Sequence, residues 1–215
     1  MIRKRVAILI SGRGSNMSAL IAAAKGVDYP AEISLVISNR PDAAGLARAQ
    51  AADIPTAVVD HKNYGEDREA FERALQAMLE AHRIELVCLA GFMRLLSPWL
   101  VARWHGRMLN IHPALLPEFK GLDTHRRALA AGVKLHGATV HLVVPDVDSG
   151  PIVLQETVPI PPGDTVETLS RRVLEVEHRI YPEALKILAL EHDPEQAGPG
   201  AGVIDRGIAT SGRNK

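Results

Sequence analysis

Short apolar runs alternate with segments of helical periodicity through the first half of the chain. Each run is too short for a helix and is typical of a strand that is buried on both faces of a parallel sheet. These predicted strands are residues 6–10, 33–38, 56–59, 86–90 and 108–112. The segments of helical spacing between them are residues 17–24, 41–52, 66–82 and 98–104. Alternation of this kind predicts an α/β fold with a mostly parallel sheet and helices on both faces.

The pattern changes after the next predicted helix, residues 124–131. Two further strands, residues 137–144 and 151–158, are separated only by the turn-forming residues 145–150. Such close spacing predicts an antiparallel hairpin, and therefore a mixed sheet.

A last, long helix is predicted from the capping signals at Asp164 to about Leu188. Pro182 lies within it and is expected to kink or break the helix after Tyr181, because proline lacks the backbone N–H that a helix interior uses.

One of the predicted strands ends in a group of polar residues. On the strand over residues 108–112, Asn110 and His112 are two positions apart, so their side chains point to the same face. Pro113 prevents the strand from continuing, which places His112 at its carboxyl end, where open α/β sheets bind ligands. An amide donor beside a titratable imidazole can act on a carbonyl that becomes an oxyanion. The alternative is an Asn–His pair that only closes a loop.

Asp148 lies in the predicted turn and is by default a turn-forming surface residue. If its carboxylate instead faces His112, it raises the pKa of the imidazole and keeps it cationic near neutral pH. His136 and His141 are interpreted as structural histidines of a strand. No grouping of His, Cys, Asp and Glu in the sequence has the spacing of a metal site, so no metal is expected.

A glycine-rich loop with the sequence SGRGSN follows the first strand at residues 11–16. A strand, a Gly-rich loop and a helix start in this order present free backbone N–H groups to a phosphate. The loop lacks the Lys-Ser/Thr pair of a P-loop and the third glycine of a dinucleotide fingerprint, which favours a phosphomonoester. The alternative is an ordinary turn in which Ser15 or Asn16 caps the helix.

A second loop, residues 91–98, follows the fourth predicted strand. Its apolar residues 92–96 can line a pocket for a flat aromatic ligand, and core packing is the alternative. Ser97 and Pro98 predict the cap and the first residue of the next helix.

Two charged residues lie on predicted helices. Arg68 is in the first turn of the helix over residues 66–82, where a cation is unfavourable for the helix dipole, and it is interpreted as solvated. Glu177 lies in the middle of the last helix and, from the pattern alone, is also interpreted as solvated.

Composition narrows the class of protein. The chain has 215 residues with 25 Lys and Arg against 25 Asp and Glu, so no bulk attraction to nucleic acid or to an anionic membrane is expected. We predict one domain over residues 1–190 and a Gly/Pro-rich tail over residues 191–215. No apolar run in the sequence approaches the length that spans a membrane. The single cysteine, Cys88, lies in a predicted buried strand and suits a reducing cytoplasm.

Five segments of the chain, in this order, resemble the phosphoribosylglycinamide formyltransferases, which are folate-dependent enzymes of purine biosynthesis. They are residues 11–16, 90–96, 110–117, 136–141 and 148–152. The Asn-x-His-Pro element with a later Asp is specific to the folate formyltransferase fold, and the GRGSN loop narrows the resemblance to the glycinamide ribonucleotide branch. The resemblance covers roughly residues 6–188.

The resemblance implies a single-domain Rossmann-like formyltransferase fold. It implies transfer of the formyl group from 10-formyltetrahydrofolate, the co-substrate, to the amine of glycinamide ribonucleotide. The catalytic residues that it implies are Asn110, His112 and Asp148. The residues that it implies for the ribonucleotide phosphate and ribose are Gly12, Arg13, Gly14, Ser15, Asn16 and Glu177. Those that it implies for the folate are Arg68, Met93, Arg94, Leu95, Leu96, Val144, Pro145, Asp146 and Val147.

A protein of this kind is expected in the cytoplasm as a monomer or a weak homodimer, with small-molecule substrates and with no nucleic-acid or membrane partner. Two positions depart from the family pattern. Asp123 stands where many relatives have His, and Glu118 adds an acid beside the Pro-rich loop. Both changes bear on the hydrogen bonding and charge near the expected site.

Other readings remain open. A methionyl-tRNA or sugar-nucleotide formyltransferase and a formyl-folate hydrolase share the catalytic residues. The tRNA enzyme should carry a basic C-terminal domain after Leu188, and the hydrolase an extra domain before Val6. A non-catalytic nucleotide-binding module belongs to a different class. A Rossmann dehydrogenase is disfavoured by the glycine spacing and by Pro41 and Asp42 where a ribose-binding acid would be expected.

Overall fold

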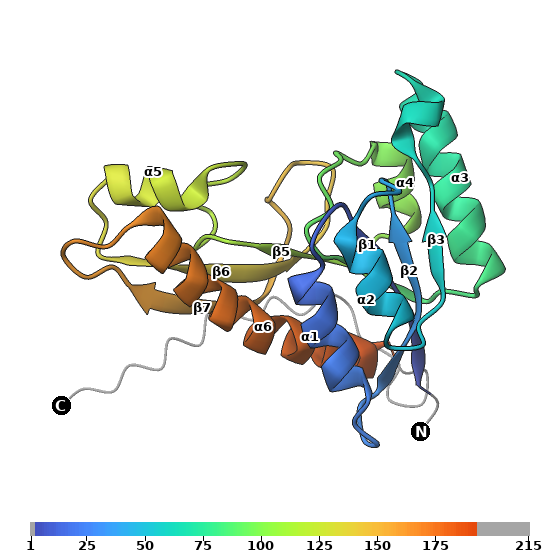
Figure 1. The fold of residues 1–215 in the computed structure, drawn as a ribbon, viewed down its shortest axis with the longest axis horizontal. Coiled ribbons are helices and arrows are strands. Elements are labelled where there is room, and N and C mark those ends of the chain that lie inside the picture. The colour runs from blue at the N-terminus through green and yellow to red at the C-terminus, as the bar shows by residue number, and fades with distance from the viewer. Residues whose placement is uncertain (1–2, 193–215) are drawn as a thin grey trace.

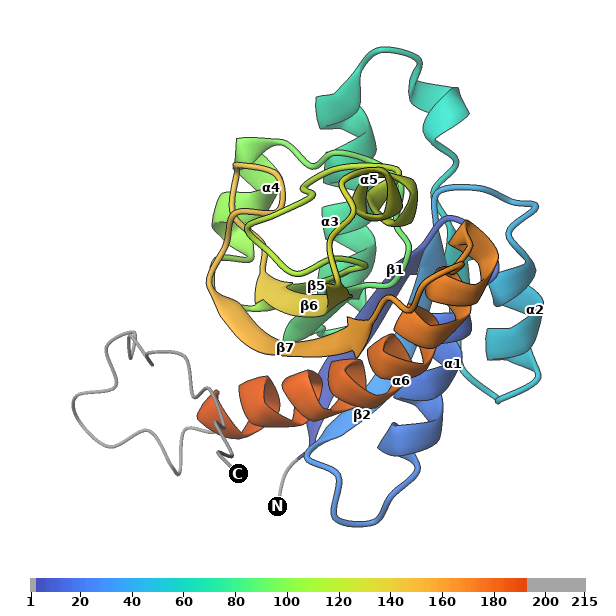
Figure 2. The same ribbon diagram turned by 90° about the vertical axis from the view of Figure 1, so that its left-hand side faces the viewer.

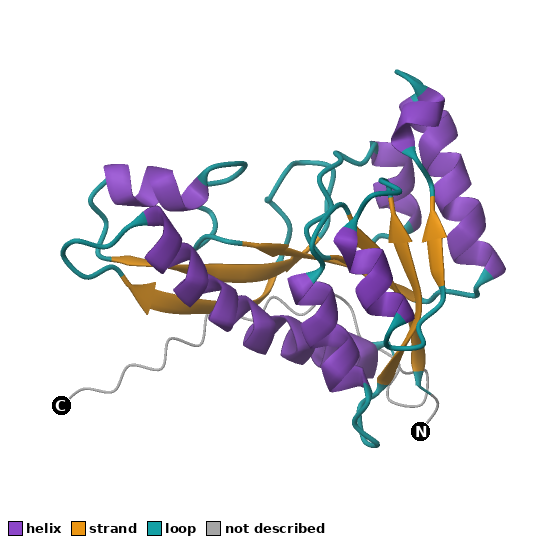
Figure 3. Cartoon of the chain, in the orientation of Figure 1, coloured by secondary structure: helices purple, strands orange, loops and turns teal. Residues whose placement is uncertain are grey.

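Seven strands form one mixed sheet. The structure is a computed structural model that describes residues 3–192. The strands are β1 (Lys4–Ile10), β2 (Ala31–Ser38), β3 (Thr56–Val58), β4 (Leu86–Leu89), β5 (Met108–His112), β6 (Leu135–Leu142) and β7 (Ile152–Pro159). Their order across the sheet is β3-β2-β1-β4-β5-β6-β7 (Figure 1). Figure 3 shows the strands and the helices that flank them. The first five are parallel, and β6 and β7 are antiparallel, so the predicted mixed sheet and its C-terminal hairpin are confirmed.

Six α-helices and one short 3₁₀ helix are present in the described part of the chain. They are α1 (Ser15–Ala24), α2 (Ala44–Gln50), η1 (His61–Tyr64), α3 (Arg68–Ala81), α4 (Pro98–Arg103), α5 (Thr124–Ala130) and α6 (Val166–Glu191). The periodicity predicted every α-helix to within a few residues at each end. It did not predict η1, because four residues are too few to show a period.

Hydrophobic cores lie on both faces of the sheet, as alternation along β1 shows. Val6, Ile8 and Ile10 belong to the core that packs under α1, α2 and α6. Ala7 and Leu9 belong to the core on the opposite face, under α3 and α4. Figures 1 and 2 show these two sets of helices on either side of the strands. A strand that is apolar at every position is therefore required here, since both of its faces are covered.

Cys88 lies in the middle of β4 and is fully buried. Burial raises the pKa of its thiol to about 12. The expectation of a core residue is confirmed.

The expected break at Pro182 is wrong, because α6 continues through it to Glu191. Residues on both sides of the proline are buried, including Tyr181, Ala184 and Leu185. The Tyr181 hydroxyl also lies within hydrogen-bond distance of two strand carbonyls beneath the helix, those of Leu89 and Leu109. Burial of several large side chains offsets a proline penalty of about 3 kcal/mol, so packing overrides the local signal.

No helix within residues 3–192 combines the length and the apolar character needed to cross a membrane. The helix α6 runs one residue past the expected domain boundary at residue 190. Beyond residue 192, the predicted tail lies outside the described residues.

Candidate active site

The strand β5 presents Asn110 and His112 on one face. Leu109 and Ile111 point the other way and belong to the core under α6. Asn110 is level with Leu89, the last residue of the parallel neighbour β4, so His112 extends beyond the end of that strand. His112 is buried nevertheless, because the loop that follows β5 folds back against it.

Asp148 completes a cluster with these two residues. One of its carboxylate oxygens, Oδ2, lies 3.3 Å from His112 Nδ1 and accepts a hydrogen bond of 2.9 Å from the Gly121 backbone N–H. The other, Oδ1, lies 3.5 Å from Asn110 Nδ2. The Asp148 side chain is only 9% exposed, and its backbone is left-handed with φ 49°. The structure therefore turns this carboxylate inward, against the default expectation of a solvated turn residue.

His141 also belongs to the cluster, although it was interpreted from the sequence as structural. It pairs with Asn110 across the antiparallel strands β5 and β6. Its Nε2 lies 3.2 Å from Asn110 Nδ2 and 3.5 Å from Asp148 Oδ1. Its Nδ1 lies 2.9 Å from the carbonyl of Leu142, which can only accept, so Nδ1 carries a hydrogen. Only the register between β5 and β6 brings His141 to the cluster, and the sequence pattern does not contain that register.

Burial lowers the pKa of His112, and this effect outweighs the Phe119 carbonyl and the Asp148 charge, which both raise it. His141 and Arg127 add to the lowering. The expectation of a cationic imidazole near neutral pH is therefore wrong for the ligand-free protein. That expectation took account of the Asp148 carboxylate but not of the loss of solvent around the imidazole ring.

Asp148 stays ionised in the same surroundings. Burial alone would raise its pKa, but the interaction with His141, the hydrogen bond from the Gly121 N–H and the neighbouring His112 imidazole hold the pKa below its ordinary value. The cluster thus contains a neutral imidazole beside a carboxylate anion at neutral pH, and it can receive one proton.

The glycine-rich loop begins α1 without a side-chain cap. Gly14 is the residue before the helix, with a left-handed φ of 73°, and no side chain bonds the first amides. A Cβ at Gly14 would lie 3.0 Å from the Cα of Gly45, so only glycine fits without movement. The alternative of a Ser15 or Asn16 cap is wrong, and the amides of the first turn are left to an external acceptor.

Glu177 of α6 reaches this loop. Its Oε2 accepts a hydrogen bond of 2.7 Å from Asn16 Nδ2, and the residue is only 7% exposed. Burial raises the pKa of the carboxyl, although the bond from Asn16 opposes this. The interpretation of Glu177 as solvated is therefore wrong. The other amide atom, Asn16 Oδ1, is buried and has no hydrogen-bond partner among the described residues.

The second loop joins β4 to α4. Met93 and Leu95 are 65% and 62% exposed, while Phe92 and Leu96 pack against the core. An exposed pair of large apolar side chains marks this loop as a candidate ligand surface. The Met93 backbone N–H donates to Ser11 Oγ at 2.8 Å, which ties this loop to the glycine-rich loop.

Ser97 precedes α4 as expected, with Pro98 at the start of the helix. It makes no cap bond, because its hydroxyl and its backbone N–H both donate to the fully buried carboxylate of Glu72 on α3. Glu72 thereby holds the end of the second loop.

Two groups of predicted folate residues are exposed. Arg68 begins α3, whose cap is the side chain of Asp67, and it faces solvent as expected. Pro145, Asp146 and Val147 form the exposed part of the turn that carries Asp148, while Val144 is half-buried. Arg94 is half-buried in the second loop, and Arg13 is exposed in the first.

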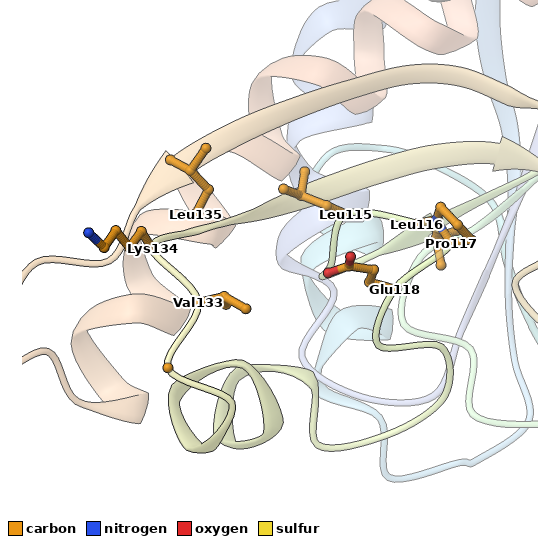
Figure 4. A pocket seen from close by; sticks show the side chains of 8 residues that line it. Leu115, Leu116, Pro117, Glu118, Val133, Lys134 and Leu135 are labelled. Atoms are coloured by element: carbon orange, nitrogen blue, oxygen red, sulfur yellow. The ribbon is translucent and has the colours of Figure 1, made fainter.

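The two departures from the family pattern lie outside the cluster. Asp123 precedes α5 in a left-handed conformation, φ 57°, and is exposed. Glu118 lines a surface groove between the loop after β5 and the start of β6, whose other lining residues include Leu115, Val133 and Leu135. Figure 4 shows the Glu118 carboxylate among these residues and the Lys134 side chain directed away from them. None of the predicted catalytic residues lines this groove.

Comparison with known proteins places the chain in a family. Residues 4–185 match the formyl transferase family. The chain belongs to the formyl transferase family. Within residues 3–192, no group of three or more His, Cys, Asp or Glu side chains is placed to hold a metal ion.

Individual relatives agree with this membership. The chain is 46% identical over 183 residues to phosphoribosylglycinamide formyltransferase of Haemophilus influenzae. The match covers 85% of this chain and 86% of that protein. The crystal structure of phosphoribosylglycinamide formyltransferase from Brucella melitensis has a TM-score of 0.83 at 51% identity, covering 94% of this chain and 98% of that one. The chain is also 52% identical over 187 residues to the human trifunctional purine biosynthetic protein adenosine-3, covering 87% of this chain but only 18% of that protein's length.

Proposed function

We propose that this formyl transferase moves the formyl group of 10-formyltetrahydrofolate to the amine of glycinamide ribonucleotide. The products are formylglycinamide ribonucleotide and tetrahydrofolate, and the step belongs to de novo purine biosynthesis. The similarity to bacterial phosphoribosylglycinamide formyltransferases over most of both chains supports this choice of substrates. We also expect these small molecules to be its only substrates. We expect the protein in the cytoplasm, as a monomer or a weak homodimer.

The observation that carries the proposal is the convergence of Asn110, His112 and Asp148 at the carboxyl end of β5. The Asp148 carboxylate lies 3.5 Å from the Asn110 amide nitrogen and 3.3 Å from the His112 imidazole. Formyl transfer to an amine needs a donor for the oxyanion, a group that moves a proton and a charge that stabilises the protonated form of that group. These three side chains supply those needs.

The reaction begins when the amine nitrogen attacks the formyl carbon. The C–N bond forms, and the electron pair of the C=O bond moves to oxygen. Asn110 donates a hydrogen bond to the resulting oxyanion. Because burial keeps His112 neutral in the free protein, its imidazole accepts the proton that the attacking nitrogen loses.

Collapse of the tetrahedral intermediate completes the transfer. The oxyanion reforms the carbonyl, the bond to the folate nitrogen breaks, and the imidazolium returns its proton to that nitrogen. Asp148 is ionised throughout and stabilises the imidazolium between these two steps. The orientation of Asn110 depends on His141, whose Nε2 receives one hydrogen of the amide.

The two loops receive the remaining parts of the substrates. The ribonucleotide phosphate binds the amides that open α1, at Gly12 to Asn16, and the ribose hydroxyls reach Glu177. The folate lies against the exposed apolar side chains of Met93 and Leu95, with Arg68 and the turn before Asp148 completing its site.

The test is a formyl-transfer assay with the purified full-length protein and both substrates. We expect Asn110→Ala and His112→Ala each to lower kcat by roughly a hundredfold or more, since each removes a group that acts on the transition state. Matched controls are Asn63→Ala and His105→Ala, which change exposed residues of the same types. Turnover near that of the wild type in both site variants would contradict the assignment.

The same assay separates the proposal from its alternatives. Release of formate from the folate without an amine acceptor would indicate a hydrolase. Formylation of methionyl-tRNA or of an amino-sugar nucleotide in preference to glycinamide ribonucleotide would indicate those transferases. Binding of both ligands without turnover would indicate a binding module.

A further inference from the structure

The loop between β5 and α5 supplies two backbone groups to the catalytic cluster. The carbonyl of Phe119 lies 3.0 Å from His112 Nε2, and the N–H of Gly121 donates to Asp148 Oδ2 at 2.9 Å. His112 and Asp148 also face each other. The geometry of the cluster therefore depends on where residues 119–121 of this loop lie.

The loop backbone has an unfavourable conformation at the same point. Phe119 has φ 53° and Asp123 has φ 57°, although neither is glycine. Left-handed conformations of ordinary residues are unfavourable and persist only where surrounding contacts hold them. The contacts that hold this segment must therefore be found outside its own backbone.

Arg127, in the last turn of α5, provides such contacts. Its Nη1 donates to the Lys120 carbonyl at 2.6 Å and to the Leu122 carbonyl at 3.2 Å. Its guanidinium carbon lies 5.7 Å from the centre of the Phe119 ring. A planar guanidinium with several donors can hold two carbonyls and a ring face at once, which a lysine ammonium cannot do as well.

A weaker tie holds the loop from its other side. Lys120 Nζ donates to Ser149 Oγ at 2.6 Å, in the turn that carries Asp148. Both side chains are exposed, so this bond alone contributes little against solvent. Arg127 remains the residue that contacts the carbonyls on both sides of Gly121.

We propose that Arg127 is a positioning residue for formyl transfer, which holds the Phe119 carbonyl on His112 and the Gly121 N–H on Asp148 without touching the substrates. The inference rests on the proposed function, because it takes His112 and Asp148 as the groups that act. No sequence motif pointed to it: Arg127 lies on an exposed helix among ordinary charged residues.

Several ionisable groups surround His112 and must be considered together. Asp148 and His141 face it from the hairpin, Arg127 and His125 from α5, and the buried His136 from β6. Loss of Arg127 removes a cation, which raises the pKa of His112. It also frees the Phe119 carbonyl, which lowers the pKa of His112, so the two effects oppose each other. The effect on Asp148 has one direction, because losing the Gly121 N–H raises its pKa.

The experiment compares Arg127→Ala and Arg127→Lys with Arg126→Ala, which changes the adjacent exposed arginine. For Arg127→Ala we expect kcat to fall roughly ten- to a hundredfold, because a small displacement of catalytic groups has effects of this size. The Michaelis constants should change less than kcat. Arg127→Lys should lie between Arg127→Ala and the wild type.

A second readout does not use activity. Hydrogen exchange of the Gly121 amide, followed by NMR on the intact protein, should be faster in Arg127→Ala and unchanged in Arg126→Ala. If Arg127→Ala is too unstable for this measurement, the exchange rate of the Gly121 amide is compared between Arg127→Lys and the wild type under native conditions.

The proposal is overturned if Arg127→Ala keeps the kcat and the Gly121 exchange rate of the wild type. It is also overturned if Arg126→Ala shows equal losses. Failure of the proposed function looks different: the wild type would then lack formyl transfer, or His112→Ala would retain it, whatever the Arg127 variants do.

Discussion

His112 stands between two hydrogen-bond acceptors. The Phe119 carbonyl faces Nε2 at 3.0 Å and the Asp148 carboxylate faces Nδ1 at 3.3 Å. A neutral imidazole has one N–H and can satisfy only one of them, while the imidazolium satisfies both. Burial opposes the charge and leaves the ring neutral in the free protein. Protonation of His112 therefore satisfies both acceptors without moving the ring.

Replacement of Asp148 by Asn should separate its charge from its shape. We expect Asp148→Asn to lower kcat by roughly a hundredfold or more, because the imidazolium formed during transfer loses its counter-charge. The apparent pKa that governs His112 should move lower, since the remaining burial still opposes protonation. The measurement is the pH dependence of kcat, with the exposed Asp28→Asn as control. An unmoved profile would contradict this role of Asp148.

At the scale of elements, the two candidate substrate loops are joined through Ser11. Its hydroxyl donates to Asn39 Oδ1 at 2.6 Å and accepts the Met93 backbone N–H at 2.8 Å. All of this lies at the carboxyl ends of neighbouring strands, with Ser11 and Asn39 both buried. A change in the conformation of the phosphate loop should therefore change the position of the folate loop.

Ser11→Ala removes the acceptor of the Met93 N–H and leaves the buried Asn39 Oδ1 without its donor. We expect a loss of about 1–3 kcal/mol in the free energy of unfolding and a raised KM for the formyl donor. We also expect a weaker mutual effect of the two ligands on each other's affinity, measured by titrating each in the presence and absence of the other. Ser170→Ala, on the half-buried surface of α6, is the control. Unchanged coupling of the ligands would show that the two loops act independently.

Local pattern predicted the elements well and long-range contacts poorly. Period-two spacing placed Asn110 and His112 on one face, and this needs no knowledge of other strands. His141 and Glu177 belong to the site because of strand register and helix docking, which join residues more than 30 positions apart. The break expected at Pro182 did not occur, since burial along α6 outweighs local propensity.

At the scale of the whole molecule, buried histidines set the response to acid. His136 of β6 has no exposed surface, and its ring lies edge-on to those of Phe119 and His125, at 5.8 and 5.3 Å. Burial, followed by the charge of His125, lowers its pKa to about 4. Neither ring nitrogen has a hydrogen-bond partner in the described part of the protein.

This histidine should destabilise the fold as the pH falls. In the unfolded chain it takes up a proton near pH 6.5, and in the folded chain only near pH 4. Between these values the unfolded state binds more protons, so stability decreases from about pH 6.5 downward. The loss between pH 7 and pH 5 from this residue is about 2 kcal/mol.

Urea unfolding at pH 7 and pH 5 measures this loss. His136→Gln should show a smaller difference between the two pH values than the wild type, because glutamine does not titrate. His105→Gln, at an exposed position, should behave as the wild type. Equal pH dependence in all three proteins would exclude His136 as a source of the acid sensitivity.

The buried thiol of β4 has a practical consequence. Because Cys88 is the only cysteine in the sequence and is fully buried in the core under α1, α2 and α6, a thiol reagent can reach it only when this core opens. The rate of its modification under native conditions would then report how often this core opens. The chain thus carries its own probe of rare opening events, without any introduced label.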